Sequence, residues 1–546
     1  MPFCEGTGRQ RRHKQDLGET LSGSRKVATP YEVTFLDPVP WRSLCEDFLD
    51  AADIKQLKDA IEDDYFFEIF VDDLPMWGYL GEVVHEEFLL GKSIQGARVY
   101  LYPHLHFTIG FNNDQIVSAN VTTDPKRRVD ITDVLSGGQE IVFSYSIEWI
   151  HTPEISYEHR MDRYADSTFL PSSFETHWLS IINSFVLVIL LTAFLAIILM
   201  RILKKDFSRY LEVDEDEATD DSETGWKRIN GDVFRSPKSV SLLTAFIGSG
   251  AQLFSTVLIT LLCVILGIFK ATKRGALLTA VIIIYALCGF IGGSLAGRLY
   301  KQLTGTISTN WQWNIVTTAC IFPVPLGLVF AWVNTIAWNS SSTAALPITT
   351  ILLMCSILVF VHFPLTVFGA IVGRNMTSEF RPPCRKNMAA REIPLINAWY
   401  RQPFAQLIMA GFLPFSAIYI ELHYIFAAIW GHKIYTLFGI LFLAFIMLII
   451  VTSFITIALC YFQLAREDYH WWWTAFWNGG ATGLFIFGYS FFYLFHRSNM
   501  SGWLQLSFYF GYTGIVSYAF VMMLGFVGFM SSFSFVQYIY GAVKTD

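Results

Sequence analysis

Nine long apolar runs between residues 178 and 531 are the feature that most limits what this chain can fold into. A helix rises ~1.5 Å per residue, so ~20 mostly apolar residues are needed to cross a hydrocarbon layer of ~30 Å. The nine runs therefore predict nine transmembrane helices. They cover approximately residues 178–200, 244–269, 275–298, 311–335, 347–373, 405–429, 435–462, 473–495 and 504–531.

The residues before the first run have the character of a soluble domain. Over the whole chain 53% of residues are hydrophobic and only 16% are charged, whereas a soluble domain carries ~25% charged residues. We expect six parts in sequence order: a disordered or truncated start (1–30), a lumenal β-rich domain (31–170), the first span (178–200), an acidic cytosolic loop (201–243), the remaining eight spans (244–531) and a cytosolic tail (532–546).

Short runs of alternating apolar and polar residues predict a β-sandwich for the N-terminal domain, because successive residues of a strand face opposite sides of a sheet. Residues 50–63 have apolar residues at helical spacing and predict one helix. The predicted strands are residues 31–36, 66–71, 99–102, 106–111, 115–121 and 140–149.

Lysine and arginine residues in the connecting loops predict the orientation of the chain. If the N-terminus lies outside the cytosol, the cytosolic loops carry 18 Lys and Arg residues and the opposite side carries 7. Positive residues gather on the cytosolic side of membrane proteins. We therefore expect a lumenal N-terminal domain and a cytosolic C-terminus.

The start of the chain lacks one expected element. Residues 1–26 contain no apolar core of the ~7–15 residues that a signal peptide has. We expect that the start is truncated, or that the first membrane helix directs insertion.

Four Asn-x-Ser/Thr sequences are candidate glycosylation sites, at Asn120, Asn339, Asn375 and Asn499. The predicted orientation places Asn375 in the cytosol and Asn499 close to two spans, which leaves Asn120 and Asn339 as the expected acceptors. Cys4 and Cys45 precede the spans and are candidates for a disulfide bond in an oxidising compartment.

Two further groups of polar residues are candidates for other roles. His104 and His106 would share one face of a strand, but further metal ligands are absent nearby, so packing or surface histidines are the favoured interpretation. Eight of the twelve residues from Glu212 to Glu223 are acidic and predict a solvated loop, with a docking surface for a basic partner as the alternative.

Several long motifs are distinctive: residues 60–79, 177–184, 225–226, 232–235, 363–366, 391–394, 411–416, 461–464 and 467–473, with the C-terminal Lys544-Thr545-Asp546. With these segments the chain resembles the nonaspanins, the transmembrane nine superfamily, and within it the chain is most similar to the member-1 type. The resemblance covers residues 4 to 546, but the cleaved signal and the lumenal stretch that open family members are missing here.

The resemblance implies residence in Golgi and endosomal membranes, and sorting or surface delivery of other membrane proteins. It also implies links to adhesion, phagocytosis or autophagy, and no enzymatic activity. For the C-terminal Lys544, Thr545 and Asp546 it implies recognition by the coatomer coat, to which a cytosolic tail would present one lysine, one acidic side chain and the terminal carboxylate.

Glycines spaced by four form two smooth helix faces: Gly289, Gly293 and Gly297 in one run, and Gly479 and Gly483 in another. Small residues let two helices approach closely in a membrane. One interpretation is packing inside the bundle. The other is a docking face for glycine-rich transmembrane segments of cargo proteins, the class that the family is thought to escort.

Glu421 lies inside the sixth run, where an ionisable side chain is costly and is a functional candidate. His362 and Gln252, in other runs, are candidate partners. A structural hydrogen-bond network is one interpretation, and a channel or secondary transporter using Glu421 and His362 is the alternative to a sorting protein. We expect no catalytic residue, cofactor, metal or nucleic-acid partner, because the chain has no His-Glu-x-x-His, Gly-x-Ser-x-Gly or glycine-rich phosphate loop.

Overall fold

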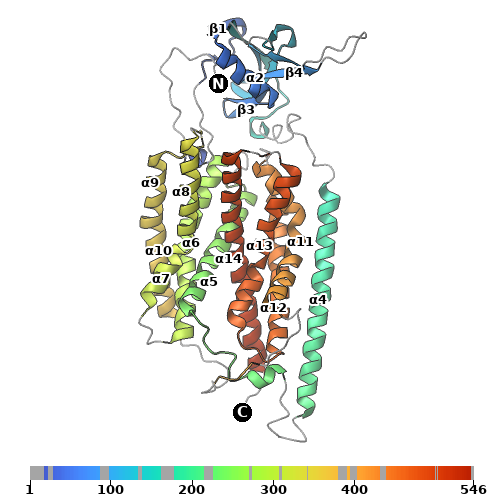
Figure 1. Ribbon diagram of the computed structural model, residues 1–546, viewed down its shortest axis with the longest axis vertical. Helices are drawn as coiled ribbons and strands as arrows, with labels where there is room; N and C mark the ends of the chain where they lie inside the picture. The colour runs from blue at the N-terminus through green and yellow to red at the C-terminus, as the bar shows by residue number, and fades with distance from the viewer. Residues whose placement is uncertain are drawn as a thin grey trace. The chain divides into compact units, whose positions relative to one another are not determined.

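The computed structural model divides the chain into two compact units, residues 26–175 and 176–546, and the short helix α1 (Leu17–Leu21) packs on the second unit. Figure 1 shows the strands in the first unit and the long helices in the second. The structure describes residues 17–21, 29–85, 97–132, 138–160, 177–213, 225–269, 274–305, 310–340, 342, 344–378, 390–393, 402–430, 438–498, 500 and 502–542.

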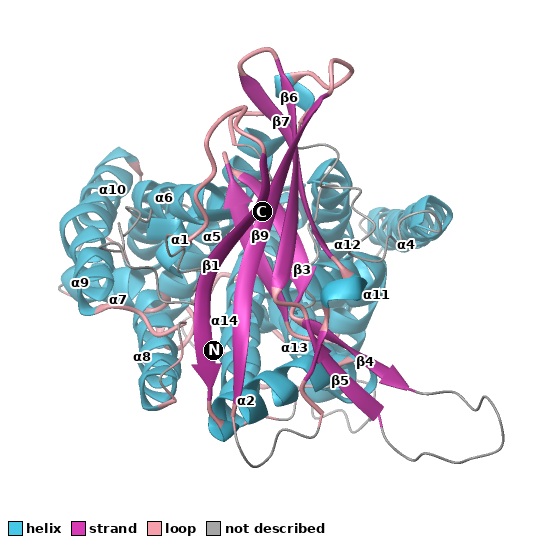
Figure 2. Ribbon diagram, turned by 90° about the horizontal axis from the view of Figure 1, so that it is seen from above, coloured by secondary structure: helices cyan, strands magenta, loops and turns pink. Residues whose placement is uncertain are grey.

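The N-terminal unit is built on a four-stranded sheet in the order β1-β9-β6-β7, whose central pair, β6 and β9, is parallel. Figure 2 shows these long strands side by side. The strands are β1 (Val39–Leu49), β6 (His104–Asn112), β7 (Gln115–Thr123) and β9 (Gln139–His151). A two-stranded sheet joins β2 (Phe66–Val71) to β3 (Leu74–Tyr79), and a three-stranded sheet joins β4 (Gly81–His85), β5 (Ala97–Leu101) and β8 (Val129–Asp130).

Two hydrophobic cores hold these sheets together. In one, Leu74 and Met76 of β3 pack against Phe107, Tyr145 and Ile147 of the large sheet, which gives the sandwich-like arrangement. In the other, the apolar face of α2 (Ala51–Glu62) covers β5 and β9. Asp50 caps α2 by accepting hydrogen bonds from the backbone N–H groups of Ala52 and Asp53, so this predicted helix is confirmed.

The predicted strand at residues 31–36 is wrong, because these residues form no strand and the chain enters the sheet at β1 instead. β1 contains Pro40, Arg42, Glu46 and Asp47, and it departs from regular register at two places, so it lacks a clear alternation. β3 and β4 were also missed. The other predicted strands coincide with β2, β5, β6, β7 and β9.

Helices occupy all nine predicted runs in the part of the second unit that the structure describes. Seven of them are long and apolar enough to cross a membrane. The first and eighth runs also form helices, α4 (His177–Val213) and α13 (Trp471–Arg497). The others are α5 (Val240–Ile265), α6 (Arg274–Thr304), α7 (Trp311–Cys320) with α8 (Pro323–Asn339), α9 (Ile348–Ile357) with α10 (Phe363–Met376), α11 (Pro403–Trp430), α12 (Phe438–Leu464) and α14 (Trp503–Ala542).

Two helices continue well past the apolar runs that predicted them. α4 extends to Val213, into the predicted loop, and α14 extends to Ala542, into the predicted tail. Residues 225–235 of the same predicted loop are also folded, and Trp226, Ile229 and Val233 are buried there. Most of the acidic stretch 212–223 lies outside the described residues.

Candidate functional sites in the helical unit

The span made of α7 and α8 is broken at Ile321 and Phe322, where the sequence continues as Pro323-Val324-Pro325. Proline has no backbone N–H, so Pro323 cannot donate to the carbonyl of Ala319 and Pro325 cannot donate to that of Ile321. In a bilayer the freed carbonyls need other donors. The hydroxyl of Tyr518 donates to the freed carbonyl oxygen of Ile321 at 2.9 Å. Ser249 donates to the nearby carbonyl oxygen of Thr318 at 2.9 Å.

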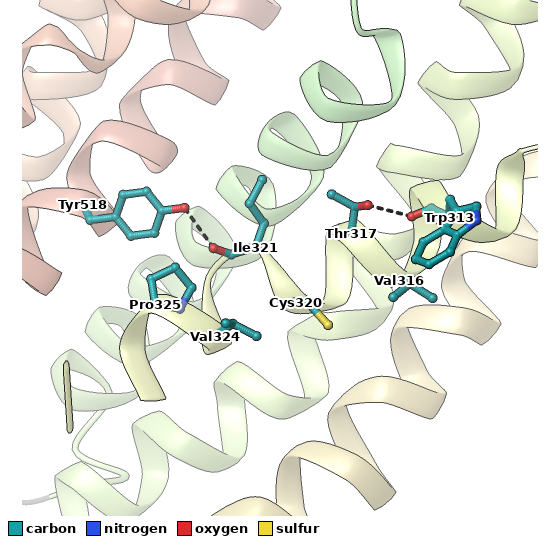
Figure 3. Close-up of a pocket in the computed structure, with 8 residues that line it drawn as sticks. All are labelled: Trp313, Val316, Thr317, Cys320, Ile321, Val324, Pro325 and Tyr518. Carbon is teal, nitrogen blue, oxygen red and sulfur yellow. Dashed lines mark hydrogen bonds between the residues drawn. The ribbon is translucent and has the colours of Figure 1, made fainter. Parts of the chain in front are cut away.

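A groove of about 430 Å³ follows this break (Figure 3). Its lining is mainly apolar, and two of its residues are strongly exposed: Trp313 at 70% and Val324 at 51%. Its polar parts are the hydroxyls of Thr317 and Tyr518 and the kinked backbone. The groove residues are Trp313, Val316, Thr317, Cys320, Ile321, Val324, Pro325 and Tyr518.

A buried polar contact lies next to the broken span. His362 ends a π-helical turn, Leu358–His362, that joins α9 to α10, and only 2% of its surface is exposed. Its Nε2 atom lies 3.4 Å from the side-chain oxygen of Gln252, whose amide nitrogen donates to the carbonyl of Tyr285 at 2.9 Å. The ring of Tyr285 stacks on His362 and contacts Phe322 at the break. Two interrupted spans therefore meet through one polar and aromatic contact.

Glu421 is buried in α11, at 7% exposure, but it does not join His362 and Gln252. α11 packs on α12 and α13, whereas α10 packs on α6, and Figures 1 and 2 show α10 and α11 on opposite sides of the unit. The candidate partnership of Glu421 with His362 and Gln252 is therefore wrong. None of the three residues lines the groove of Figure 3.

The first glycine face is covered by another helix of the same chain. A Cβ atom at Gly293 would overlap the carbonyl of Thr366 in α10, and one at Gly297 would lie 2.5 Å from that of Ala370. Gly369 and Gly373 of α10 approach the α6 backbone equally closely. Gly289, Gly293 and Gly297 thus form a packing face, and a cargo helix has no access to it.

The second glycine face is covered as well. Gly479 lies against Leu524 and Gly528 of α14, and Gly483 lies against Ser517 and Val521 of the same helix. The interpretation of the glycines as a docking face for cargo is therefore not retained for either set.

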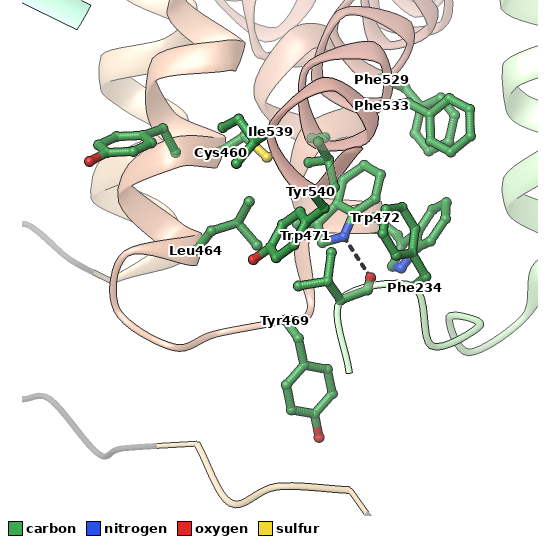
Figure 4. Close-up of a cluster of buried hydrophobic side chains, with 14 of the residues drawn as sticks. Phe234, Cys460, Leu464, Tyr469, Trp471, Trp472, Phe529, Phe533, Ile539 and Tyr540 are labelled. Carbon is green, nitrogen blue, oxygen red and sulfur yellow. Dashed lines mark hydrogen bonds between the residues drawn. The ribbon is translucent and has the colours of Figure 1, made fainter. Parts of the chain in front are cut away.

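A group of buried aromatic and apolar residues surrounds the C-terminal end of α14 (Figure 4). We call this group the C-terminal platform. Its members come from segments that are far apart in the sequence. They include Trp226, Ile229, Val233 and Phe234, then Tyr461 and Leu464, then Trp471 and Trp472, and finally Phe529, Phe533, Ile539 and Tyr540.

Hydrogen bonds fix the platform. Tyr540 Oη donates to the carbonyl of Trp226 at 2.7 Å, and the indole N–H of Trp471 donates to the carbonyl of Val233 at 3.0 Å. Arg228 forms an ion pair with Glu467 at 3.5 Å. Four of the motifs that carry the family resemblance, around residues 226, 232–235, 461–464 and 467–473, meet here. The predicted signal Lys544-Thr545-Asp546 lies outside the described residues, which reach Ala542.

The predicted glycosylation and disulfide sites lie on separate elements of the two units. Asn120 lies exposed on β7, opposite Thr108 of β6, and Asn339 lies exposed at the end of α8. Cys45 is disulfide-bonded, and Cys4, its predicted partner, lies outside the described residues, so the pairing stays a prediction. Asn375 is exposed near the end of α10.

Sequence reasoning missed Tyr518, Tyr285 and Tyr540, because a single tyrosine in an apolar run gives no sign of its hydrogen-bond acceptor. It also missed Gly369 and Gly373, although their spacing of four residues was visible. A search for two glycine faces of matching length would have indicated that α6 and α10 are partners.

Comparisons with known proteins agree with the motifs. The family model for endomembrane protein 70 matches residues 1–503. Transmembrane 9 superfamily member 4 of Arabidopsis thaliana is 46% identical over 100% of this chain and 90% of its own length. Transmembrane 9 superfamily member 1 of Mus musculus is 43% identical over 98% of this chain and 88% of its own.

A relative in Dictyostelium discoideum, described as putative phagocytic receptor 1b, is 43% identical over 100% of this chain and 90% of its own length. No solved structure matches. The family model spans most of the chain, and the relatives match it nearly end to end. The chain therefore belongs to the endomembrane protein 70 family, the transmembrane 9 superfamily, and is a multi-span membrane protein.

Proposed function

We propose that this protein sorts other membrane proteins in Golgi and endosomal membranes and assists their delivery to the cell surface. Its N-terminal unit would lie in the lumen and its C-terminal platform in the cytosol, as the distribution of Lys and Arg residues in the loops favours. A relative's description as a putative phagocytic receptor supports a role in processes that depend on surface delivery, such as adhesion and phagocytosis. A role in autophagy would follow from the same traffic.

The anchored end of α14 is the observation that carries the proposal. Within the platform, Tyr540 is hydrogen-bonded to the carbonyl of Trp226. The proposed coat-binding signal begins at Lys544, two positions after the last described residue of α14. A tail that leaves a fixed point so close to its signal would present Lys544 and Asp546 to the coatomer coat with little loss of conformational entropy. The bilayer and cargo proteins would be the other partners.

Cargo would dock on the groove of Figure 3, because the glycine faces are already covered. The groove offers exposed apolar side chains beside a kinked backbone, on a span that would face lipid. A glycine-rich transmembrane segment can bring its own backbone close to such a surface. The glycines of the interaction would then belong to the cargo.

Delivery of paired reporters tests this function. Cells lacking the protein would express a reporter with a glycine-rich transmembrane segment and a matched reporter with leucines at the glycine positions. We expect the wild-type protein to restore surface delivery of the first reporter alone. Val324→Trp, which fills the groove, should fail to restore it, whereas Leu328→Trp on the exposed side of α8 should succeed. Equal restoration by Val324→Trp would rule out the groove, and unchanged reporter delivery without the protein would rule out the function.

A further inference from the structure

Two histidines and two serines form a continuous chain of hydrogen bonds in the N-terminal unit, across the parallel seam between β6 and β9. His104 Nδ1 lies 2.8 Å from Ser144 Oγ, and His104 Nε2 lies 3.0 Å from Ser146 Oγ. Ser146 Oγ also lies 2.8 Å from His106 Nδ1, and His106 Nε2 lies 3.3 Å from Glu148. We call this set of five residues the seam chain.

The carboxylate at one end gives the seam chain a direction. An ionised carboxylate only accepts hydrogen bonds, so the proton of neutral His106 sits on Nε2, facing Glu148, and Nδ1 accepts from Ser146. Ser146 has a single hydrogen and therefore accepts from Nε2–H of His104. His104 Nδ1 in turn accepts from Ser144. One charged group thus sets the tautomers of both rings.

Because the seam chain is buried, a hydroxyl hydrogen that finds no acceptor is costly there. His104, Ser144 and Ser146 are 6%, 7% and 6% exposed. If His106 is protonated, its Nδ1 becomes a donor and Ser146 can no longer donate to it. The hydrogen of Ser146 then needs another acceptor, because a buried donor without a partner costs ~1–3 kcal/mol. Within the seam chain, only Nε2 of His104 can accept the hydrogen of Ser146, and it can do so only when the proton of His104 is on Nδ1.

The charged groups around the two rings favour His106 as the residue that takes up a proton. Glu148 of β9, 60% exposed, would pair with a charged His106. His104 faces Arg127 and Asp124, from the turn after β7, and these two form an ion pair with each other at 3.6 Å. Opposite His106, β7 places the uncharged Thr122, and opposite Ser144, β1 places Ser43. Burial, Arg127 and His106 together lower the pKa of His104, so it resists a charge of its own.

We propose that the seam chain is a proton-operated switch, in which one proton taken up at His106 reverses every hydrogen bond between His106 and Ser144. His106 gains a proton from solvent and becomes charged. His104 releases its Nε2 proton to solvent, takes one from solvent on Nδ1 and stays neutral, so the net uptake is the one proton held by His106. The switch goes beyond the proposed sorting function and does not depend on it.

The reversal of the hydrogen bonds ends at Ser144, next to an irregularity in the register of β1. His104 would donate to Ser144, whose hydroxyl must turn to a new acceptor. Ser144 pairs with Ser43 of β1 where the register of β1 shifts before Cys45, and its backbone N–H donates to the carbonyl of Pro103. A change at Ser144 is thereby passed to β1, which carries the disulfide-bonded Cys45.

Nitrogen NMR of ¹⁵N-histidine in the full-length protein in nanodiscs tests the switch, because it distinguishes the two neutral tautomers from the charged ring. His104→Gln and His106→Gln assign the signals, and the exposed His151 on β9, which is not part of the seam chain, is an internal control. We expect both rings as Nε2–H tautomers at pH 7.5. As His106 becomes charged on acidification, His104 should change to the Nδ1–H tautomer over the same pH interval. A His104 that keeps Nε2–H after His106 has titrated would overturn the proposal.

Variants of Ser146 and Glu148 test individual hydrogen bonds of the seam chain. Ser146→Ala should let His106 titrate while the tautomer of His104 no longer follows, and Ser146→Thr should restore the coupling. If Ser146→Ala does not fold, the exposed Glu148 provides the test. The amide of Glu148→Gln can donate as well as accept, so the Nε2–H tautomers of both rings should lose population at pH 7.5. Unchanged tautomers in Glu148→Gln would contradict the assigned direction.

Discussion

The hydroxyl of Tyr540, near the end of α14, donates a 2.7 Å hydrogen bond to the carbonyl oxygen of Trp226, and both residues are almost fully buried. The two residues are 314 positions apart in the sequence. The ring of Tyr540 also meets those of Trp226 and Phe234 edge to face. This contact ties the last turns of α14 to the segment that follows α4, and it anchors the described end of that helix.

Tyr540→Phe should loosen this anchor. The variant removes the hydroxyl that donates to the buried carbonyl of Trp226, so we expect a loss of ~0.5–1.5 kcal/mol in local stability. Hydrogen exchange at residues 226–234 and limited proteolysis near the C-terminus would measure it. Tyr538→Phe, at a position that is 74% exposed, is the matched control and should change neither. Equal exchange in both variants would show that the contact does not hold the tail.

Gly293→Ala should separate α6 from α10. Its Cβ would overlap the carbonyl of Thr366, and overpacking of a tight core costs ~1–3 kcal/mol or more. We expect a lower midpoint of thermal unfolding in detergent. Gly488→Ala is the control, because nothing lies within 4 Å of a Cβ there and alanine is favoured over glycine in a helix. A Gly293→Ala protein as stable as the Gly488→Ala protein would contradict the close packing of α6 and α10.

Tyr518→Phe should destabilise the broken span by ~1–3 kcal/mol, since the Ile321 carbonyl loses its donor. Pro325→Ala restores a backbone N–H that can serve the same carbonyl. In the Pro325→Ala background, Tyr518→Phe should therefore cost less. Unfolding of the four proteins in a double-mutant cycle measures the difference. Additive effects would mean that Tyr518 does not compensate for the proline.

The N-terminal unit should lose stability on acidification. Burial holds the pKa of His104 below its ordinary value, so the unfolded chain takes up that proton first as the pH falls. The contribution of His104 is complete above the unfolded pKa of ~6.5 and is lost as the pH falls from there toward the folded pKa. Hydrogen exchange of β6 and β9 between pH 7.5 and 5, corrected with unfolded peptides, should show the loss. His104→Gln should reduce the pH dependence, and an unchanged slope would contradict it.

Much of the helical unit was predictable from the sequence, because a membrane span must be long and apolar whatever it packs against. The two ends that were misjudged, at α4 and α14, are continued by residues that are polar or aromatic. The sequence predicts a cytosolic tail over residues 532–546, which includes Tyr540. Its burial depends on Trp226 and Phe234, which a scan of neighbouring residues cannot connect with it.

The candidate sites were harder to predict, because each depends on contacts between distant segments. The spacing of Gly289, Gly293 and Gly297 correctly indicated a close approach of helices, but only the structure identifies α10 as the neighbour. For His104 and His106, the shared face was predicted. The seam chain also needs Ser144 and Ser146, which a parallel strand brings beside them.

The tail is the most direct test of the proposed sorting function. Lys544→Ala should prevent recognition by the coat and move the protein from the Golgi toward endosomes and the cell surface. Quantitative surface labelling of cells that express the wild-type protein, Lys544→Ala or the control Lys238→Ala would measure the surface fraction. We expect it to rise severalfold for Lys544→Ala alone. A distribution identical to that of the wild type would contradict the central claim that the anchored C-terminus is a sorting signal.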